Sequence, residues 1–160
     1  MAETSTLSTS TFFADTPPQA HPLMQRLVRE HGAHWVDLAT LPAWLAAAPG
    51  DAVILIAGDA VRFPEGLDVA VVLPELRTDA CQAFRIGIAT PADEDAIGQR
   101  YGAQRRPSLV FVRDGRYVTT VSGMHDWTDF LALVRNALAS PTTHAPIAIQ
   151  SAGAAASSCH

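Results

Sequence analysis

The stretch YGAQRRPSLVFVRDG, residues 101–115, carries the strongest structural signal in the chain. Its first two residues are typical of the end of a helix, and Pro107 then opens an apolar run, SLVFV. That run meets a second one, RYVTTVSG, across Asp114-Gly115, a dipeptide that favours a tight β-hairpin turn. The sequence therefore predicts a helix, a proline-led strand and an antiparallel hairpin in immediate succession.

Upstream, short apolar runs alternate with segments of helical periodicity. Strands are expected over residues 34–38, 52–57 and 84–89, and helices over 22–31, 41–48 and 90–102, the last with Thr90 as its N-cap. A final helix starts at Asp126 and is expected to turn five side chains to the core, namely Trp127, Phe130, Leu131, Val134 and Leu138. Because strands that alternate with helices pair in parallel, we expect an α/β fold with a mixed central sheet, helices on both faces and the hairpin strands at its edge.

The segment DVAVVLPELRTD, residues 68–79, fits two structures. Its Val-Ala-Val-Val run is typical of a strand. As a helix it would place Val69, Val72, Leu73 and Leu76 on one side, with a kink at Pro74. Periodicity alone does not decide between them.

Composition narrows the class of protein. The 160 residues are 48% hydrophobic and 17% charged, with a formal net charge of −5. This balance argues against nucleic acid as a partner and fits a partner that presents positive charge. We expect a disordered segment over residues 1–19, one folded domain over 20–139 and a flexible Ala/Ser-rich tail over 140–160. No export signal or membrane span is recognisable, so the cytoplasm is the expected compartment.

The ambiguous segment resembles part of a known fold family. Its run VVLPEL, residues 71–76, is similar to the proline-kinked helix that follows the redox motif of thioredoxins, which favours the helical interpretation. Matching Pro74 to that proline places Gly66-Leu67-Asp68-Val69 where thioredoxins carry Cys-x-x-Cys. The resemblance therefore implies a thioredoxin-like fold that is redox-inactive at this site, because no thiol is left there for disulfide exchange.

Seven short motifs occur in order along the folded part of the chain: Gly58-Asp59, Arg62, Pro64-Glu65, Ala96-Ile97-Gly98, Arg100-Tyr101-Gly102, Arg106-Pro107 and Gly123-Met124-His125-Asp126-Trp127. Together they resemble a narrower family, the HyaE/HupG/HoxO-type hydrogenase assembly chaperones, and within it the HoxO group. The resemblance covers residues 22–139 and implies a cytoplasmic, non-enzymatic chaperone of hydrogenase maturation. Its implied partner is the small, iron–sulfur subunit precursor of a membrane-bound nickel–iron hydrogenase, with the twin-arginine signal peptide still attached.

Pro107 marks the candidate site for protein–protein interaction. We expect the peptide bond before Pro107 to be cis. In a thioredoxin-like fold, the backbone just before this proline forms an open edge that pairs with an extended peptide. The alternative, of equal weight, is a turn that only positions the start of the strand. The flanking Arg105 and Arg106 fit solvated surface better than partner contacts, whereas the acids of the loop after the central strand suit a cationic peptide. The candidate partner-binding residues are Asp59, Arg62, Glu65, Asp68, Arg106 and Pro107.

Cysteine chemistry gives the main alternative. Cys81, beside Ala80 and Ala83, is expected to be a buried thiol, and Cys159 lies in the tail. A lone-cysteine thiol oxidoreductase or peroxidase stays open, because Arg77 and Arg85 flank Cys81 in the sequence. A scaffold for other maturation factors is a third possibility. We expect no metal and no cofactor, since the histidines lack ligand spacing, and His125 is expected to cap or pack.

Overall fold

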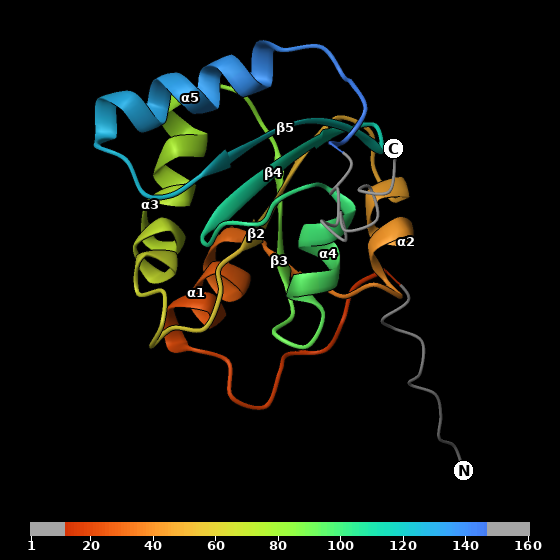
Figure 1. Cartoon of the computed structure of the whole chain (residues 1–160), viewed down its shortest axis with the longest axis vertical. Helices are drawn as coiled ribbons and strands as arrows, with labels where there is room; N and C mark the ends of the chain where they lie inside the picture. The colour runs from red at the N-terminus through yellow and green to blue at the C-terminus, as the bar shows by residue number, and fades with distance from the viewer. Residues whose placement is uncertain (1–11, 147–160) are drawn as a thin grey trace, which may run out of the picture.

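The computed structural model of the chain describes residues 12–146. Five strands form one sheet with helices on both faces, as Figure 1 shows. In chain order the elements are α1 (Pro22–His31), β1 (His34–Val36), α2 (Leu41–Ala46), β2 (Asp51–Ile56), α3 (Glu65–Asp79), β3 (Arg85–Ala89), α4 (Glu94–Arg100), β4 (Ser108–Arg113), β5 (Arg116–Ser122) and α5 (Trp127–Ala139). This order is the one that the sequence predicts.

The strand order β1-β3-β2-β4-β5 makes the sheet mixed. β3 pairs in parallel with β1 and β2, whereas β4 pairs antiparallel with both β2 and β5. The hairpin turn holds Asp114 at φ 53° and Gly115 at φ 81°, the two positive angles that a two-residue turn of this type requires. Of the two hairpin strands, only β5 lies at an edge of the sheet. The expectation that both hairpin strands lie at the edge is wrong for β4, because β4 pairs with β2 on one side and with β5 on the other.

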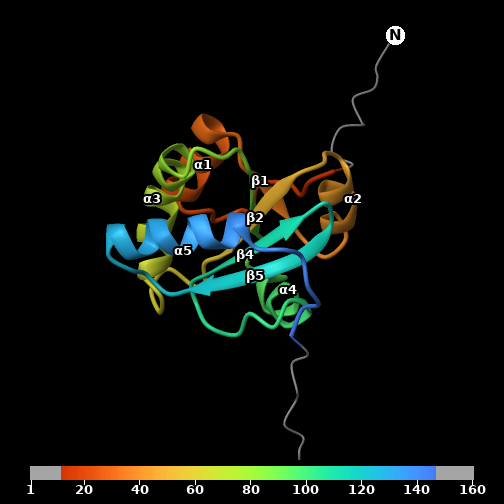
Figure 2. The ribbon, with the colours of Figure 1, turned by 90° about the horizontal axis from the view of Figure 1, so that it is seen from above.

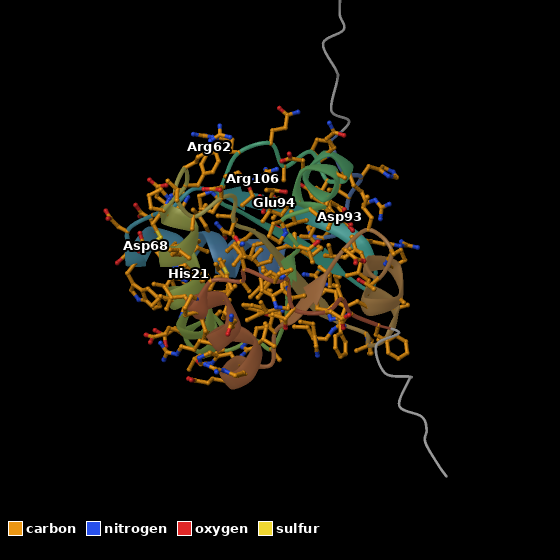
Figure 3. The ribbon with its side chains drawn as sticks, turned by 90° about the horizontal axis from the view of Figure 1, so that it is seen from below. His21, Arg62, Asp68, Asp93, Glu94 and Arg106 are labelled. Atoms are coloured by element: carbon orange, nitrogen blue, oxygen red, sulfur yellow. The ribbon has the colours of Figure 1, made fainter. Side chains whose placement is uncertain are left out.

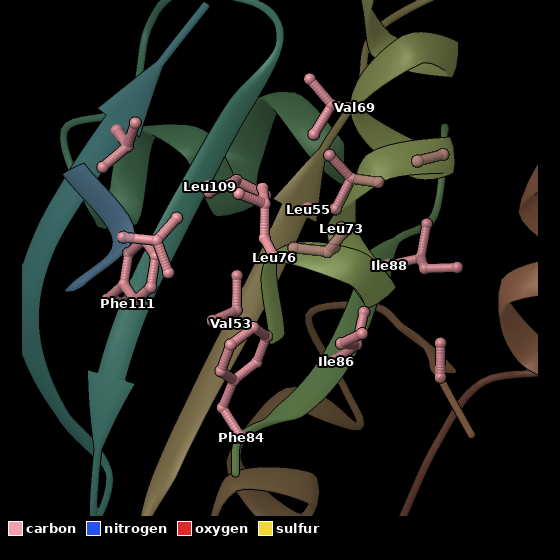
Figure 4. Packing of buried hydrophobic residues seen from close by; sticks show 14 of the residues in the cluster. Val53, Leu55, Val69, Leu73, Leu76, Phe84, Ile86, Ile88, Leu109 and Phe111 are labelled. Carbon is pink, nitrogen blue, oxygen red and sulfur yellow. The ribbon is translucent and has the colours of Figure 1, made fainter. Parts of the chain in front are cut away.

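Alternate residues of the central strand feed two cores. Val53 and Leu55 of β2 face α1, α3 and α5, whereas Ile54 and Ile56 face α2 and α4. Figure 2 shows these two groups of helices on opposite sides of the sheet, and Figure 4 shows the packing on the α3 side. Each fully buried aliphatic side chain contributes about 1.5–3 kcal/mol relative to exposure, so the two clusters account for the stability of the domain.

The segment 68–79 is helical. It lies within α3, which continues through Pro74 and buries Val69, Leu73 and Leu76 against the sheet. This confirms the interpretation that followed from the thioredoxin resemblance.

Three local predictions are wrong. Thr90 is not a helix cap: its N–H donates to Val36 O and prolongs the pairing of β3 with β1, and α4 starts at Glu94. Trp127 is the first residue of α5 but is 39% exposed, because the first turn of that helix extends beyond the core. Cys81 is exposed instead of buried, since it follows the end of α3 in a left-handed turn at φ 56°.

Both ends of the described chain contact the folded unit. Ala14 N donates to Trp35 O at 2.8 Å beside β1, and Thr143 N donates to Tyr117 O at 2.8 Å on β5. These two hydrogen bonds place part of residues 12–19 beside β1 and part of residues 140–146 beside β5, while the expectation of a disordered start and a flexible tail stays a prediction. The rest of each predicted segment, residues 1–11 and 147–160, lies outside the described residues. Among residues 12–146, no helix combines the length and apolar character that a membrane span needs.

Candidate functional site

One end of the sheet gathers the residues that the sequence singles out. Ile56 at the end of β2 pairs with Ser108 at the start of β4, which pairs in turn with Ser122 at the end of β5. The loop of residues 58–64 after β2, the Arg106–Pro107 turn and the loop before α5 therefore meet there. The Arg106–Pro107 bond is cis, as predicted, and Pro107 itself is buried.

Gly58 joins the first two of these segments. It has φ 83°, and a Cβ there would lie 2.7 Å from Phe63 Cδ2 and 3.1 Å from Arg106 Cβ. Only glycine fits a backbone so placed. The loop after β2 and the Arg106–Pro107 turn therefore lie directly against each other.

Asp59 shapes the loop. Its Oδ1 accepts hydrogen bonds from Val61 N at 2.7 Å and from Arg62 N at 3.1 Å. The backbone N–H of Arg62, followed by that of Val61, holds the pKa of the Asp59 carboxyl below its usual range. This carboxylate is exposed, but two of its acceptor sites are already used to fold the loop.

Arg106 is not solvated surface. Its side chain is only 10% exposed, and its guanidinium donates to Asp95 Oδ1 at 2.8 Å and to Ala103 O at 3.0 Å. It therefore braces α4 and the turn before β4, and the solvated-surface interpretation is wrong for this residue. The exposed cation of the pair is Arg105.

The remaining predicted residues lie on the open surface. Arg62, Glu65 and Asp68 are exposed, and the Arg62 guanidinium lies 5.4 Å from the centre of the Phe63 ring. Figure 3 shows Arg62 and Asp68 pointing outward on this side of the molecule. Three exposed apolar side chains belong to the loops at the same end, namely Val61 (89% exposed), Met124 (38%) and Trp127 (39%). We call residues 58–68, 105–107 and 123–127 the loop face.

The first turn of α3 occupies the place that the thioredoxin resemblance assigns to the redox cysteines. A Cβ on Gly66 would lie 2.6 Å from Ala57 O, and Val69 is 1% exposed in the core. These positions pack the helix onto β2 and offer no reactive group. Cys81 follows the other end of α3. Because a helix of 15 residues is about 22 Å long, Cys81 is separated from the first turn by about this distance.

A hollow of about 650 Å³ opens next to the loop face. Its walls come from the start of α1, the ends of β1 and β3, the loop after β2 and the first turn of α4, where Glu94 lies. Burial raises the pKa of the Glu94 carboxyl above its usual range. Glu94 is not among the binding residues predicted from the sequence. It follows the carboxyl end of a parallel strand, however, and α/β folds place binding groups at such positions.

His125 has a packing role. Its Nε2 lies 2.8 Å from Ser122 O, and its ring packs edge-on against Phe130 with centroids 5.3 Å apart. Within residues 12–146, no group of three or more His, Cys, Asp or Glu side chains is placed to hold a metal ion.

Comparison with known proteins gives consistent matches. The family described as "Hydrogenase-1 expression protein HyaE" matches residues 23–130. The chain is 52% identical to hydrogenase expression/formation protein HoxO of Cupriavidus necator, over 87% of this chain and 88% of that protein. It is 41% identical to hydrogenase expression/formation protein HupG of Bradyrhizobium diazoefficiens, over 63% and 70%. A mutant thioredoxin from Halobacterium salinarum superposes with a TM-score of 0.53 at 18% identity, over 66% of this chain and 90% of the thioredoxin, which establishes the thioredoxin-like fold.

Proposed function

Since the chain belongs to the HyaE family of hydrogenase expression proteins, we propose that it is a non-catalytic, cytoplasmic chaperone of nickel–iron hydrogenase maturation. Its client is the small, iron–sulfur subunit precursor, bound while the twin-arginine signal is attached. The family and the names of the relatives support a role in hydrogenase formation. The choice of client rests on the motif resemblance to the hydrogenase assembly chaperones.

One observation supports the proposal most: the backbone before Pro107 is unpaired, at the end of the sheet where the chain has no cysteine. Within residues 12–146, neither the backbone N–H nor the backbone C=O of Arg106 has a hydrogen-bond partner. The edge next to Pro107 is therefore free to pair with an extended peptide, and such main-chain pairing gives affinity without demanding one sequence. Exposed acids and apolar side chains of the loop face surround it.

The alternative of a lone-cysteine enzyme finds little support in the geometry. Cys81 lies one helix length from the loop face, at the opposite end of α3. The two arginines that flank it in the sequence are engaged elsewhere, because Arg77 donates to His31 O and Phe84 O and Arg85 donates to carbonyls at the end of α2. Cys159 lies outside the described residues.

The proposal is tested by calorimetric titration of the chain with the small-subunit precursor, with and without its export signal. The Glu65→Lys/Asp68→Lys double variant reverses two exposed charges whose side chains make no hydrogen bond to any of residues 12–146. Exposed pairs are worth about 0–1 kcal/mol each, so we expect binding to weaken by about threefold to tenfold and to depend less on salt. Asp59 is left unchanged because it folds the loop.

Glu75→Lys is the control, since Glu75 is exposed on the same helix, about 15 Å along the axis from Glu65 and about 10 Å from Asp68. Equal affinity of wild type, double variant and control would remove the loop face as the docking site. Absence of any binding to the precursor would overturn the choice of client.

A further inference from the structure

The hollow beside the loop face is built mainly of apolar side chains. Met24, Trp35, Phe63 and Leu67 line it, and Ile88 lies at its base. Its volume of about 650 Å³ falls within the range of pockets that hold drug-sized ligands, about 300–1,000 Å³. It is therefore large enough for a short segment of a partner chain.

The polar groups of the hollow are predominantly acidic. Its lining includes the carboxylates of Asp59 and Glu94 and the imidazole of His21, but no arginine or lysine. The Nδ1 of His21 accepts the N–H of Leu23 at 3.1 Å and so caps the start of α1. Figure 3 shows Glu94 between the loop after β2 and α4.

Only one of the two carboxylate oxygens of Glu94 accepts a hydrogen bond within residues 12–146. Oε2 accepts the N–H of Gly58 at 3.2 Å, whereas Oε1 has no hydrogen-bond partner among the described residues and is not one of their inaccessible atoms. The nearest cation, Arg106, donates its ion-pair bond to Asp95 and approaches only the backbone O of Glu94, at 3.5 Å. A half-buried carboxylate without an ion pair favours a cationic partner, because burial penalises an uncompensated charge.

Trp35 contributes apolar surface to the wall. The residue is 4% exposed and its indole nitrogen is buried, so the ring offers contact area to an occupant and not a hydrogen bond.

We propose that the hollow binds an extended peptide segment of the client in which an arginine or lysine is flanked by apolar residues. The cationic side chain reaches Glu94 Oε1, and the flanking groups contact Trp35, Phe63 and Leu67. This assignment rests on the proposed function for the identity of the client, but the recognition chemistry comes from the hollow alone.

The test uses a terminally blocked nine-residue peptide with one central arginine between leucines, and the same peptide with citrulline, the neutral isostere. Each is titrated calorimetrically into the full chain. Removing one partner of a partly buried charge pair weakens binding because the other charge is left unpaired, so we expect the arginine peptide to bind at least about tenfold more tightly.

Glu94→Gln keeps an acceptor for Gly58 N–H and removes the charge, so it should abolish the difference between the two peptides. Glu65→Gln is the control, because Glu65 is exposed and lies outside the hollow. Ala60→Phe fills the hollow and should weaken both peptides equally. Thermal unfolding of each variant checks that it is folded.

Equal binding of the arginine and citrulline peptides to the wild-type chain, or binding of neither, would overturn the inference whatever the variants do. Precursor titration with Glu94→Gln separates this inference from the proposed function. Full precursor affinity in that variant would refute the cationic site and leave the client intact. Selective binding of the arginine peptide without any precursor binding would refute the client and leave the site.

Discussion

At its first turn α3 contributes Gly66 and Val69 to the end of the sheet where the loop face forms, whereas its last turn is followed by the exposed thiol of Cys81. The first end has the groove, the open backbone and the charged groups, but no nucleophile. The second end has a nucleophile, but its neighbouring arginines bind backbone carbonyls. Under the proposed function, this difference makes peptide presentation and thiol chemistry separable properties of the thioredoxin-like fold.

The largest effect is expected at the tight end of α3. Gly66→Ala places a Cβ 2.6 Å from Ala57 O, a backbone atom that cannot move away without shifting β2. Overpacking of this kind costs about 1–3 kcal/mol of unfolding free energy, which urea denaturation would measure. Val71→Ala is the control for a substitution in the same helix, because Val71 is 45% exposed and lies outside the crowded first turn. Equal losses would show that crowding at the first turn does not explain the glycine.

A smaller effect is expected where Arg106 braces the loop face. Arg106→Met keeps the aliphatic stem but removes the bonds to Asp95 Oδ1 and Ala103 O. Hydrogen bonds to charged groups contribute about 1.5–3 kcal/mol when buried, and the 95% exposed Asp95 lowers this, so we expect a loss of about 1–2 kcal/mol.

Arg105→Met serves as the neighbour control, because Arg105 is exposed. If Arg106→Met unfolds at the same urea concentration as the wild type while precursor binding falls, Arg106 would be a partner contact, as its place among the candidate binding residues allows, and its bracing role would be refuted.

The smallest effect concerns pH. Burial raises the pKa of Glu94 in the native state above the reference value of 4.5, against the smaller opposing influences of Gly58 N–H and Arg106, with Asp95 and Asp59 adding to the rise. The native state therefore holds this proton more tightly than the unfolded chain, and the stability contribution is lost as the pH rises through the raised pKa.

Glu94→Gln removes this dependence, so its stability relative to wild type should increase between about pH 4 and about pH 7. Urea denaturation at both pH values measures it, with Glu65→Gln as the exposed control. A relative stability that does not change with pH would contradict an elevated pKa for Glu94.

The sequence predicts the frame well because the frame depends on local patterns. Alternating apolar runs, the Asp114-Gly115 turn and Pro107 each specify structure within a few residues, and all are found in place. The kinked helix α3 needed the family resemblance, since its periodicity fits a strand equally well.

The site is predicted less completely because it depends on contacts between distant segments. Arg106 reads as a surface cation, yet it is engaged by Asp95 across the turn. In the sequence, Glu94 is a favourable acid in the first turn of a helix. Its position in the wall of the hollow depends on α1, β3 and the loop after β2, which are distant in the sequence. Cys81 was expected inside because of its apolar neighbours, whereas the turn that ends α3 directs it to solvent.

The central claim is that the chain binds its client without a thiol. The most direct measurement is the affinity of a cysteine-free chain, Cys81→Ser/Cys159→Ser, for the small-subunit precursor, by calorimetry under reducing and oxidising conditions. The account predicts a Kd within about twofold of wild type in both, a difference of less than about 0.5 kcal/mol. A loss of about tenfold or more, or binding by the wild type that appears only under oxidising conditions, would contradict it.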